Sequence, residues 1–175
     1  AVQRYFNIGS GGDATLIIGD GFGVLTSLVL AVYPSTKIVS VNLNKSLLLD
    51  AALVSKAFPS IKLGLASTKE ELKEAYDDPN ISLILVRADD ASILNSIPFL
   101  FAANVVSMQE MDYSSIEQYF QVLRENPAKQ TFFYCCNRLE KTLYDGTVIR
   151  FNDYPWDQGD EILLNAACPW NQWYY

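Results

Sequence analysis

Short continuous apolar runs alternate along the chain with segments in which apolar residues recur every three or four positions. The first run, Ala14–Gly19, is continuous, as expected of a strand that is covered on both faces. Apolar residues at positions 25, 28, 29 and 32 then follow helical spacing, and Pro34 ends the predicted helix. The order strand, glycines, helix is therefore the first unit of the predicted fold.

The same pattern predicts further strands and helices along most of the chain. Strands are predicted over Lys37–Leu43, Ile81–Asp90, Phe99–Met108 and Gln130–Asn137. Helices are predicted over Lys45–Phe58, after a capping box formed by Ser67 and Glu70, and over Tyr113–Asn126. Ile61–Ala66 fits either a short strand or a lead into the third helix, Thr147–Tyr154 is expected to add a strand, and Asp160–Trp170 is left unassigned.

This alternation predicts an α/β fold, a doubly wound, Rossmann-like and mostly parallel sheet with helices on both faces. No linker, repeat or low-complexity tract interrupts the pattern, and 175 residues suit one domain, so residues 1–175 are expected to form a single domain. The chain begins at Ala1 rather than at a methionine, which raises the expectation of a fragment that lacks an N-terminal region.

Composition narrows the classes of partner. Half of the residues are hydrophobic, which is typical of a folded globular protein. The net charge is −7 with only 13 Lys and Arg, and no basic stripe is present, so a nucleic-acid partner is not expected. No apolar run reaches membrane-spanning length and no signal peptide is visible, which favours a cytoplasmic protein without a membrane partner. A neutral or cationic small molecule suits this charge, and a homo-oligomer is compatible with it.

Histidine is absent, which excludes Ser–His–Asp and Cys–His catalysis and histidine metal sites. The three cysteines, Cys135, Cys136 and Cys168, are interpreted as structural thiols, because the adjacent pair lies in an aromatic strand without metal-ligand spacing. No carboxylate pattern typical of a cation site occurs, so no metal site is predicted.

A glycine turn lies between the first strand and the first helix. Gly19, Gly21 and Gly23, with Asp20 and Phe22 between them, form GDGFG. Glycine permits positive φ and close approach of a ligand to the backbone, and the helix N-terminus adds free N–H groups. A dinucleotide site has the pattern GxGxxG, whose third glycine would fall at Val24, whereas GxGxG is typical of S-adenosylmethionine (SAM) sites. A tight turn without a ligand is the simpler alternative.

Polar residues follow the next strands. Asn42, with Leu43 after it, ends the second strand, where an acid normally binds the ribose hydroxyls of a nucleotide cofactor. Asp89 and Asp90 end the strand that starts at Ile81, where an acid accepts a hydrogen bond from an adenine amino group. A turn residue at position 42 and solvated loop acids at 89 and 90 are the structural alternatives.

Several ordered blocks carry a family resemblance. NVVSMQEMDYSSIEQYF, FFYCCNRLEK, YDGTVIRFNDYPWD and CPWNQW together resemble the putative sugar O-methyltransferases, a SAM-dependent family, over roughly Ala14 to Trp173. The resemblance implies a class I methyltransferase fold with a seven-stranded sheet, one strand being antiparallel. It implies that the three glycines border SAM, that Asn42 lies by the ribose and Asp89 or Asp90 by the adenine, and that the loop Asn104–Glu110, which includes Ser107, faces the methyl group and a sugar or glycan acceptor.

The sequence departs from such families at two positions. Ile17 stands where an acid usually precedes the first glycine by two residues, and Asn42 stands where an acid is preferred. Both departures weaken the expected hold on the methionine end and on the ribose. Asp20, inside the turn, is a candidate to compensate in part.

The resemblance implies methyl transfer to a sugar hydroxyl, which needs a base to remove its proton. Glu110 is favoured and Asp112 is the second choice, with Tyr113, Asp153 and Asp157 as further candidates; the alternative role of Glu110 is charge at the following helix N-terminus. Asn137, Arg138 and Trp156 are candidates to bind the acceptor, as is Trp170, although tryptophan more commonly packs in a core. An NAD(P)-linked oxidoreductase and a non-catalytic Rossmann-like binding module derived from a methyltransferase are the competing hypotheses.

Overall fold

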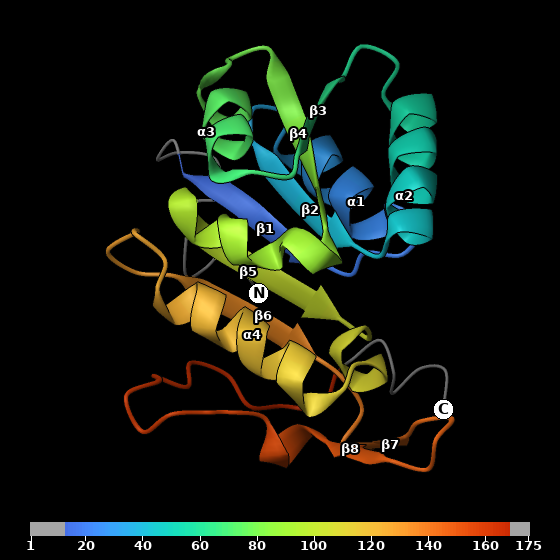
Figure 1. Cartoon of the computed structure of the whole chain (residues 1–175), viewed down its shortest axis with the longest axis vertical. Coiled ribbons are helices and arrows are strands. Elements are labelled where there is room, and N and C mark those ends of the chain that lie inside the picture. Colours follow the sequence, from blue (N-terminus) through green and yellow to red (C-terminus); the bar gives the residue numbers. More distant parts are fainter. Residues whose placement is uncertain (1–12, 169–175) are drawn as a thin grey trace.

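A computed structural model describes residues 13–168 (Figure 1). The central strands are β1 (Ala14–Ile18), β2 (Ile38–Asn42), β3 (Lys62–Ala66), β4 (Ile81–Arg87), β5 (Phe99–Val105) and β6 (Phe132–Cys136). The helices are α1 (Val24–Val32), α2 (Asn44–Ala57), α3 (Lys69–Asp77) and α4 (Tyr113–Arg124), and the 3₁₀ segments are η2 (Ala88–Ser96), η3 (Met108–Glu110) and η4 (Phe151–Asp153). A hairpin of β7 (Glu140–Thr142) and β8 (Val148–Arg150) follows β6.

The six central strands form one parallel sheet in the order β3-β4-β2-β1-β5-β6. The chain passes from β1 to β2 on one side and places β5 and β6 on the other, so the direction of winding reverses at β1. The carboxyl ends of β1 and β5 thus flank a topological switch point, where open α/β sheets bind their ligands.

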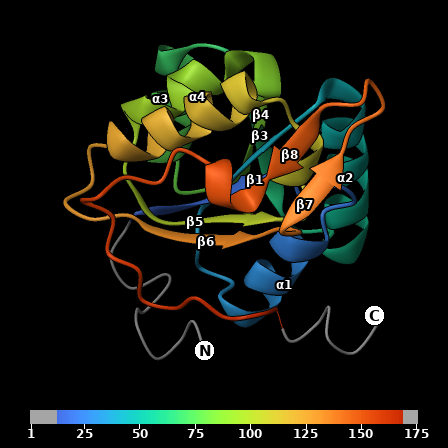
Figure 2. The same cartoon turned by 90° about the horizontal axis from the view of Figure 1, so that it is seen from below.

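Helices cover both faces of the sheet, as Figure 2 shows edge-on, with α1 and α2 on one face and α3 and α4 on the other. Alternation along the strands explains the two layers. Leu16 and Ile18 of β1 belong to the large core under α3, η2 and α4, whereas Ile17 between them packs with Leu30 of α1 and Val54 of α2. The strands are apolar on both sides because both faces are covered.

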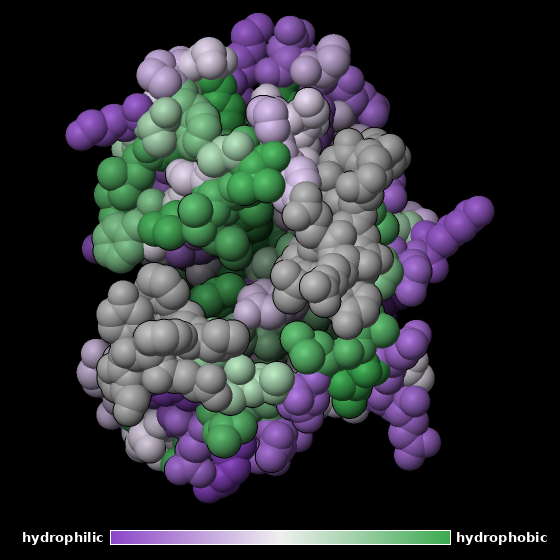
Figure 3. All heavy atoms as spheres, turned by 180° about the vertical axis from the view of Figure 1, so that it is seen from behind, coloured by the Kyte–Doolittle hydropathy of each residue, from purple (hydrophilic) through white to green (hydrophobic). Residues whose placement is uncertain are grey.

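The layer of α1 and α2 keeps apolar side chains at the surface (Figure 3). Val24, Leu28 and Val32 form an exposed stripe along α1, and Leu48, Leu49 and Leu53 are exposed on α2. No helix among residues 13–168 combines the length and the apolar character that crossing a membrane would need.

The α/β, Rossmann-like parallel sheet confirms the predicted architecture, but the seven-stranded sheet with an antiparallel strand is wrong for the part described. The sheet has six strands, and the antiparallel pairing is confined to the separate β7–β8 hairpin. The chain after β6 folds into this hairpin and η4, which pack against the α4 side, instead of returning to the sheet. Ile61–Ala66, for which the sequence allows either a short strand or a lead into a helix, forms the edge strand β3 over Lys62–Ala66.

Three local predictions also change. The capping box uses Thr68 and Glu71 rather than Ser67 and Glu70: Glu71 N donates to Thr68 Oγ1 at 3.2 Å, and the Glu71 carboxylate accepts from Thr68 N. The strand predicted to Asp90 ends at Arg87, where η2 begins. The strand predicted to Met108 ends at Val105, because Val106 has φ +63°, which a strand does not accommodate.

Candidate functional site

The glycine turn lies at the switch point, directly after β1. Gly19, Gly21 and Gly23 all have left-handed φ, at +66°, +48° and +64°. Phe22 between them also has a positive φ, +90°, which is strained for an aromatic residue, and its side chain is exposed. All three glycines of GxGxG therefore stand where the backbone adopts the positive φ that the sequence predicts for them.

The three glycines face different surroundings. A Cβ on Gly19 would lie 2.6 Å from Ser107 Cβ and closer still to its Oγ, so Gly19 permits contact between β1 and the loop after β5. A Cβ on Gly23 would lie 2.6 Å from Val54 Cγ2, so this glycine permits α1 to pack on α2. A Cβ on Gly21 would meet no atom within 4 Å. Only Gly21 leaves its surface open to a ligand.

Two carboxylates hold the turn and the start of α1. Asp20 accepts hydrogen bonds from Leu25 N at 2.7 Å and Thr26 N at 2.8 Å. Asp50, from α2, accepts from Phe22 N at 2.6 Å and Gly23 N at 2.9 Å. Backbone donors that would be orphaned at a helix N-terminus are thus satisfied within the protein.

Asp50 is the residue that sequence reasoning missed. It is 1% exposed, and burial raises its pKa, while the hydrogen bonds from Asn42, Phe22 and Gly23 oppose that shift. Its signal in the sequence was a single acid inside the apolar helix segment LLLDAALV, because a buried acid needs partners.

Asn42 completes this arrangement. Its Nδ2 donates to Asp50 Oδ2 at 2.8 Å, and its Oδ1 accepts from Leu43 N at 2.9 Å. The side chain is 9% exposed and is engaged at both ends within the protein. Asn42 lies at the carboxyl end of β2, as predicted, but the hydrogen bonds it makes support the turn.

A network of amides joins the carboxyl ends of β1, β5 and β6. Asn104 Nδ2 and Ser107 Oγ both donate to Ile18 O at 3.0 Å, and Asn104 also bonds Ser107. Asn137 Nδ2 donates to Asn104 Oδ1 at 2.8 Å. Asn104, Ser107 and Asn137 are therefore brought together beside Gly19. The sequence predicts a strand end only for Asn137, whereas the loop that contains Asn104 and Ser107 is implied by the family resemblance.

Gln109 extends this network toward Arg138. Gln109 N donates to Asn137 Oδ1 at 3.2 Å, and Gln109 Oε1 accepts from Arg138 N at 2.9 Å. The Arg138 side chain is exposed at the end of the network. Its backbone is therefore held in place while its guanidinium remains accessible.

Four exposed apolar residues, called the apolar rim below, stand at or after the carboxyl ends of β1, β2 and β5. They are Phe22, Leu43, Val106 and the last residue of β5, Val105. Val106 is a β-branched residue at φ +63°, a strained conformation of the kind that collects at functional sites. The rim suits a ligand with an apolar or aromatic part.

The two predicted catalytic acids have different environments. Glu110 is exposed, forms an ion pair with Lys141 at 3.2 Å and accepts from Gln109 Nε2 at 3.3 Å. Asp112 is the N-cap of α4: it accepts from Ser115 N at 2.7 Å and Ser114 Oγ at 2.8 Å, and these bonds lower its pKa. Both acids therefore have partners within the protein, Asp112 as a helix cap and Glu110 in an exposed ion pair.

Asp89 and Asp90 lie at the start of η2, after β4. Asp90 pairs with Arg87 at 2.8 Å, and the hydrogen bond from Arg87 holds its pKa below the usual range. Asp89 is exposed. The pair therefore sits at the carboxyl end of β4, next to β2 rather than next to the turn.

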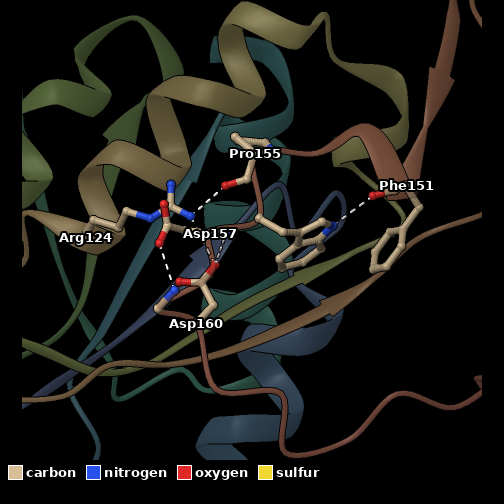
Figure 4. Close-up of polar contacts among 7 residues, drawn as sticks. Arg124, Phe151, Pro155, Asp157 and Asp160 are labelled. Atoms are coloured by element: carbon tan, nitrogen blue, oxygen red, sulfur yellow. Dashed lines mark hydrogen bonds and ion pairs between the residues drawn. The ribbon is translucent and has the colours of Figure 1, made fainter.

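Trp156 packs against α4, the helix that covers the face of the sheet opposite α1. Its ring packs edge-on to Phe120 with centroids 4.9 Å apart, and its Nε1 donates to Phe151 O at 3.0 Å. Arg124 donates to Pro155 O at 2.6 Å and pairs with Asp160, which also accepts from Asp157 N at 2.9 Å (Figure 4). These contacts anchor the loop, so Trp156 is not brought together with the glycine turn.

Tyr113 contacts the β7–β8 hairpin and Asp153: its Oη accepts from Arg150 N at 3.0 Å and lies 3.5 Å from Asp153 Oδ2. Trp170 lies outside the described residues.

Burial raises the pKa of Cys135 to about 12 and that of Cys136 to about 11, which keeps both thiols protonated. Within residues 13–168 no group of three or more acidic or cysteine side chains is placed to hold a metal ion.

Two surface pockets flank the edge strand β3 rather than the turn. One, of about 300 Å³, is lined by residues including Gly64, Glu74 and Ile81; the other, of about 220 Å³, by residues including Leu47, Leu65 and Arg87.

Comparison with protein-family models, with curated proteins and with solved structures finds no match.

Proposed function

We propose that this chain is a SAM-dependent methyltransferase that methylates a hydroxyl group of a sugar or glycan. One observation carries the proposal: three glycines at left-handed φ end the central strand at the switch point, and Gly21 leaves open space above the backbone. The exposed apolar rim of Phe22, Leu43, Val105 and Val106 suits an adenosine. The family resemblance supports the class of acceptor.

The residues present fit the cofactor. The turn would border its ribose and methionine part, and the negative charges of Asp20 and Asp50 favour a cationic ligand over an anionic one. SAM carries its methyl group on a cationic sulfonium, so transfer to a hydroxyl leaves a neutral thioether and releases one proton.

That proton needs an acceptor, which we assign to Glu110. It is an exposed acid that follows β5, and its carboxylate, which now lies 3.2 Å from Lys141, would take the proton once the acceptor hydroxyl replaces that ion pair. Arg138, held through its backbone by Gln109, lies after β6 and would contact the sugar. Asp112 would position α4 and with it the loop that carries Glu110.

Calorimetric titration of the full chain with S-adenosylhomocysteine tests the cofactor. We expect micromolar binding that Gly21→Asn abolishes, because asparagine tolerates left-handed φ while its side chain enters the open space. Gly146→Asn is the matched control: Gly146 also has positive φ, +88°, with nothing within 4 Å, but lies in the β7–β8 turn. No binding by the unaltered chain, or equal loss in both variants, would contradict the proposal.

Transfer of a labelled methyl group from SAM to a panel of sugars tests the reaction. Glu110→Gln should reduce the rate about a hundredfold or more with little effect on S-adenosylhomocysteine affinity. Binding without transfer to any sugar would instead favour the non-catalytic binding module.

A further inference from the structure

We propose that Asp20 and Asp50 make the glycine turn reject phosphate, so that it accepts a nucleoside-type ligand but not a nucleotide or dinucleotide. This inference rests on the proposed function only in that the turn is the cofactor site. It assigns cofactor selectivity to two residues, one of which, Asp50, no motif identifies.

The backbone donors at the start of α1 already have acceptors within the protein. Phosphate sites of this topology use the free N–H groups at the start of the first helix, which point at the anion. Here four N–H groups of the turn and of the first turn of α1 already donate to carboxylate oxygens at 2.6–2.9 Å: Phe22, Gly23, Leu25 and Thr26. A phosphate would have to displace these bonds to gain its own.

The negative charges of Asp20 and Asp50 also oppose a phosphate. A phosphate at the turn would meet two carboxylates close enough to each other that the Asp20 charge contributes to raising the pKa of Asp50. None of the four ion pairs found among residues 13–168 involves either acid. Like charges brought together in a partly dry site repel strongly. A neutral nucleoside escapes this penalty, and a cationic one is favoured.

The buried acid Asp50 lies beside the position where nucleotide sites carry theirs. Nucleotide sites commonly carry an acid at the end of the second strand, where this chain has Asn42. Asn42 Nδ2 donates to Asp50 Oδ2 at 2.8 Å, so the acid lies one hydrogen bond away, under the turn instead of at the ribose position. The amide and the carboxylate therefore stand at exchanged positions: Asn42 occupies the place expected for the acid, and Asp50 carries the acid.

The double exchange Asn42→Asp/Asp50→Asn tests this directly. An asparagine at 50 still offers Oδ1 to Phe22 N and Gly23 N, and its Nδ2 donates to the new carboxylate at 42, which also accepts from Leu43 N. Every hydrogen bond has a counterpart, while the charge moves away from the start of α1. The variant should therefore keep a thermal unfolding transition close to that of the unaltered chain.

The measurement is the affinity for ADP relative to adenosine, by calorimetry, for the unaltered chain and the exchanged variant. We expect the ratio to shift toward ADP by about tenfold or more. A purely structural role would lower both affinities alike and leave the ratio unchanged. The exchange leaves the net charge unchanged, so a control for net charge is needed only for the single substitution Asp20→Asn. Glu117→Gln, which removes one exposed charge on α4, is that control and should leave the ratio unchanged.

Three results would overturn the inference: a folded exchanged variant with an unchanged ratio, a control that shifts it equally, or an unaltered chain that binds ADP as tightly as adenosine. If neither protein binds adenosine but the exchanged variant gains ADP binding, the proposed cofactor fails while phosphate rejection stands. If the exchanged variant does not fold, Asp20→Asn carries the same test, because it also removes a carboxylate from the start of α1.

Discussion

Alanine substitutions at Gly19 and Gly21 should have unequal costs, although the motif treats these glycines alike. Each alanine would adopt left-handed φ, which costs about 1 kcal/mol. For Gly21→Ala that is the whole expected loss, because its Cβ would meet nothing within 4 Å. For Gly19→Ala the new Cβ would lie 2.6 Å from Ser107 Cβ, and overpacking of this kind adds about 2 kcal/mol.

Urea unfolding followed by circular dichroism measures these losses. With a slope of about 2 kcal/mol per molar, the midpoint should fall by about 0.5 M for Gly21→Ala and about 1.5 M for Gly19→Ala, with the slope unchanged. Ser107→Gly should recover part of the second loss, so that the double variant costs less than the sum of the two single ones by about 1 kcal/mol or more. Equal losses at positions 19 and 21, or strict additivity with Ser107→Gly, would refute the packing argument.

The remaining predictions concern the two acids with opposite pKa shifts and the cap of α3. Asp112 has a lowered pKa in the folded chain, so it stabilises the fold above its unfolded pKa, and this contribution is lost as the pH falls. Asp112→Ala should therefore reduce the free energy of unfolding by about 1 kcal/mol at neutral pH and by less in acid, as measured by urea unfolding at each pH. Asp50 has a raised pKa, so the folded chain binds the extra proton, and its stability relative to Asp50→Asn should fall as pH rises above about 4; a parallel pair of curves would contradict this. Thr68→Ala should cost about 1 kcal/mol and Ser67→Ala clearly less, since only the Thr68 hydroxyl accepts from Glu71 N; the reverse order would restore the cap predicted from sequence.

Much of the fold follows from local pattern. Continuous apolar runs between helical segments predict a parallel sheet covered on both faces, and β1, β2, β4, β5 and β6 lie within or at the predicted ranges. The errors are at boundaries and at the chain end, where single side chains decide. Thr68 and Ser67 are both able to cap a helix, and Thr68 is the N-cap because α3 begins at Lys69.

The candidate site divides in the same way. The sequence by itself determined the glycine turn, because GDGFG between a strand and a helix permits the left-handed backbone that all three glycines adopt. It also placed Asn137 at the end of a strand, at the edge of a parallel sheet where ligands bind. The apolar pattern put Asn104 inside a strand predicted to Met108, and only the structure, in which β5 ends at Val105, brings Asn104 to Asn137. Only the tertiary structure decided that Asp50, 27 residues beyond Gly23, satisfies the turn, and that Trp156 packs on α4 instead of facing the turn. The physical reason is that periodicity reports which face of an element is buried, whereas the partner of a buried carboxylate or indole depends on how two elements far apart in the chain pack together.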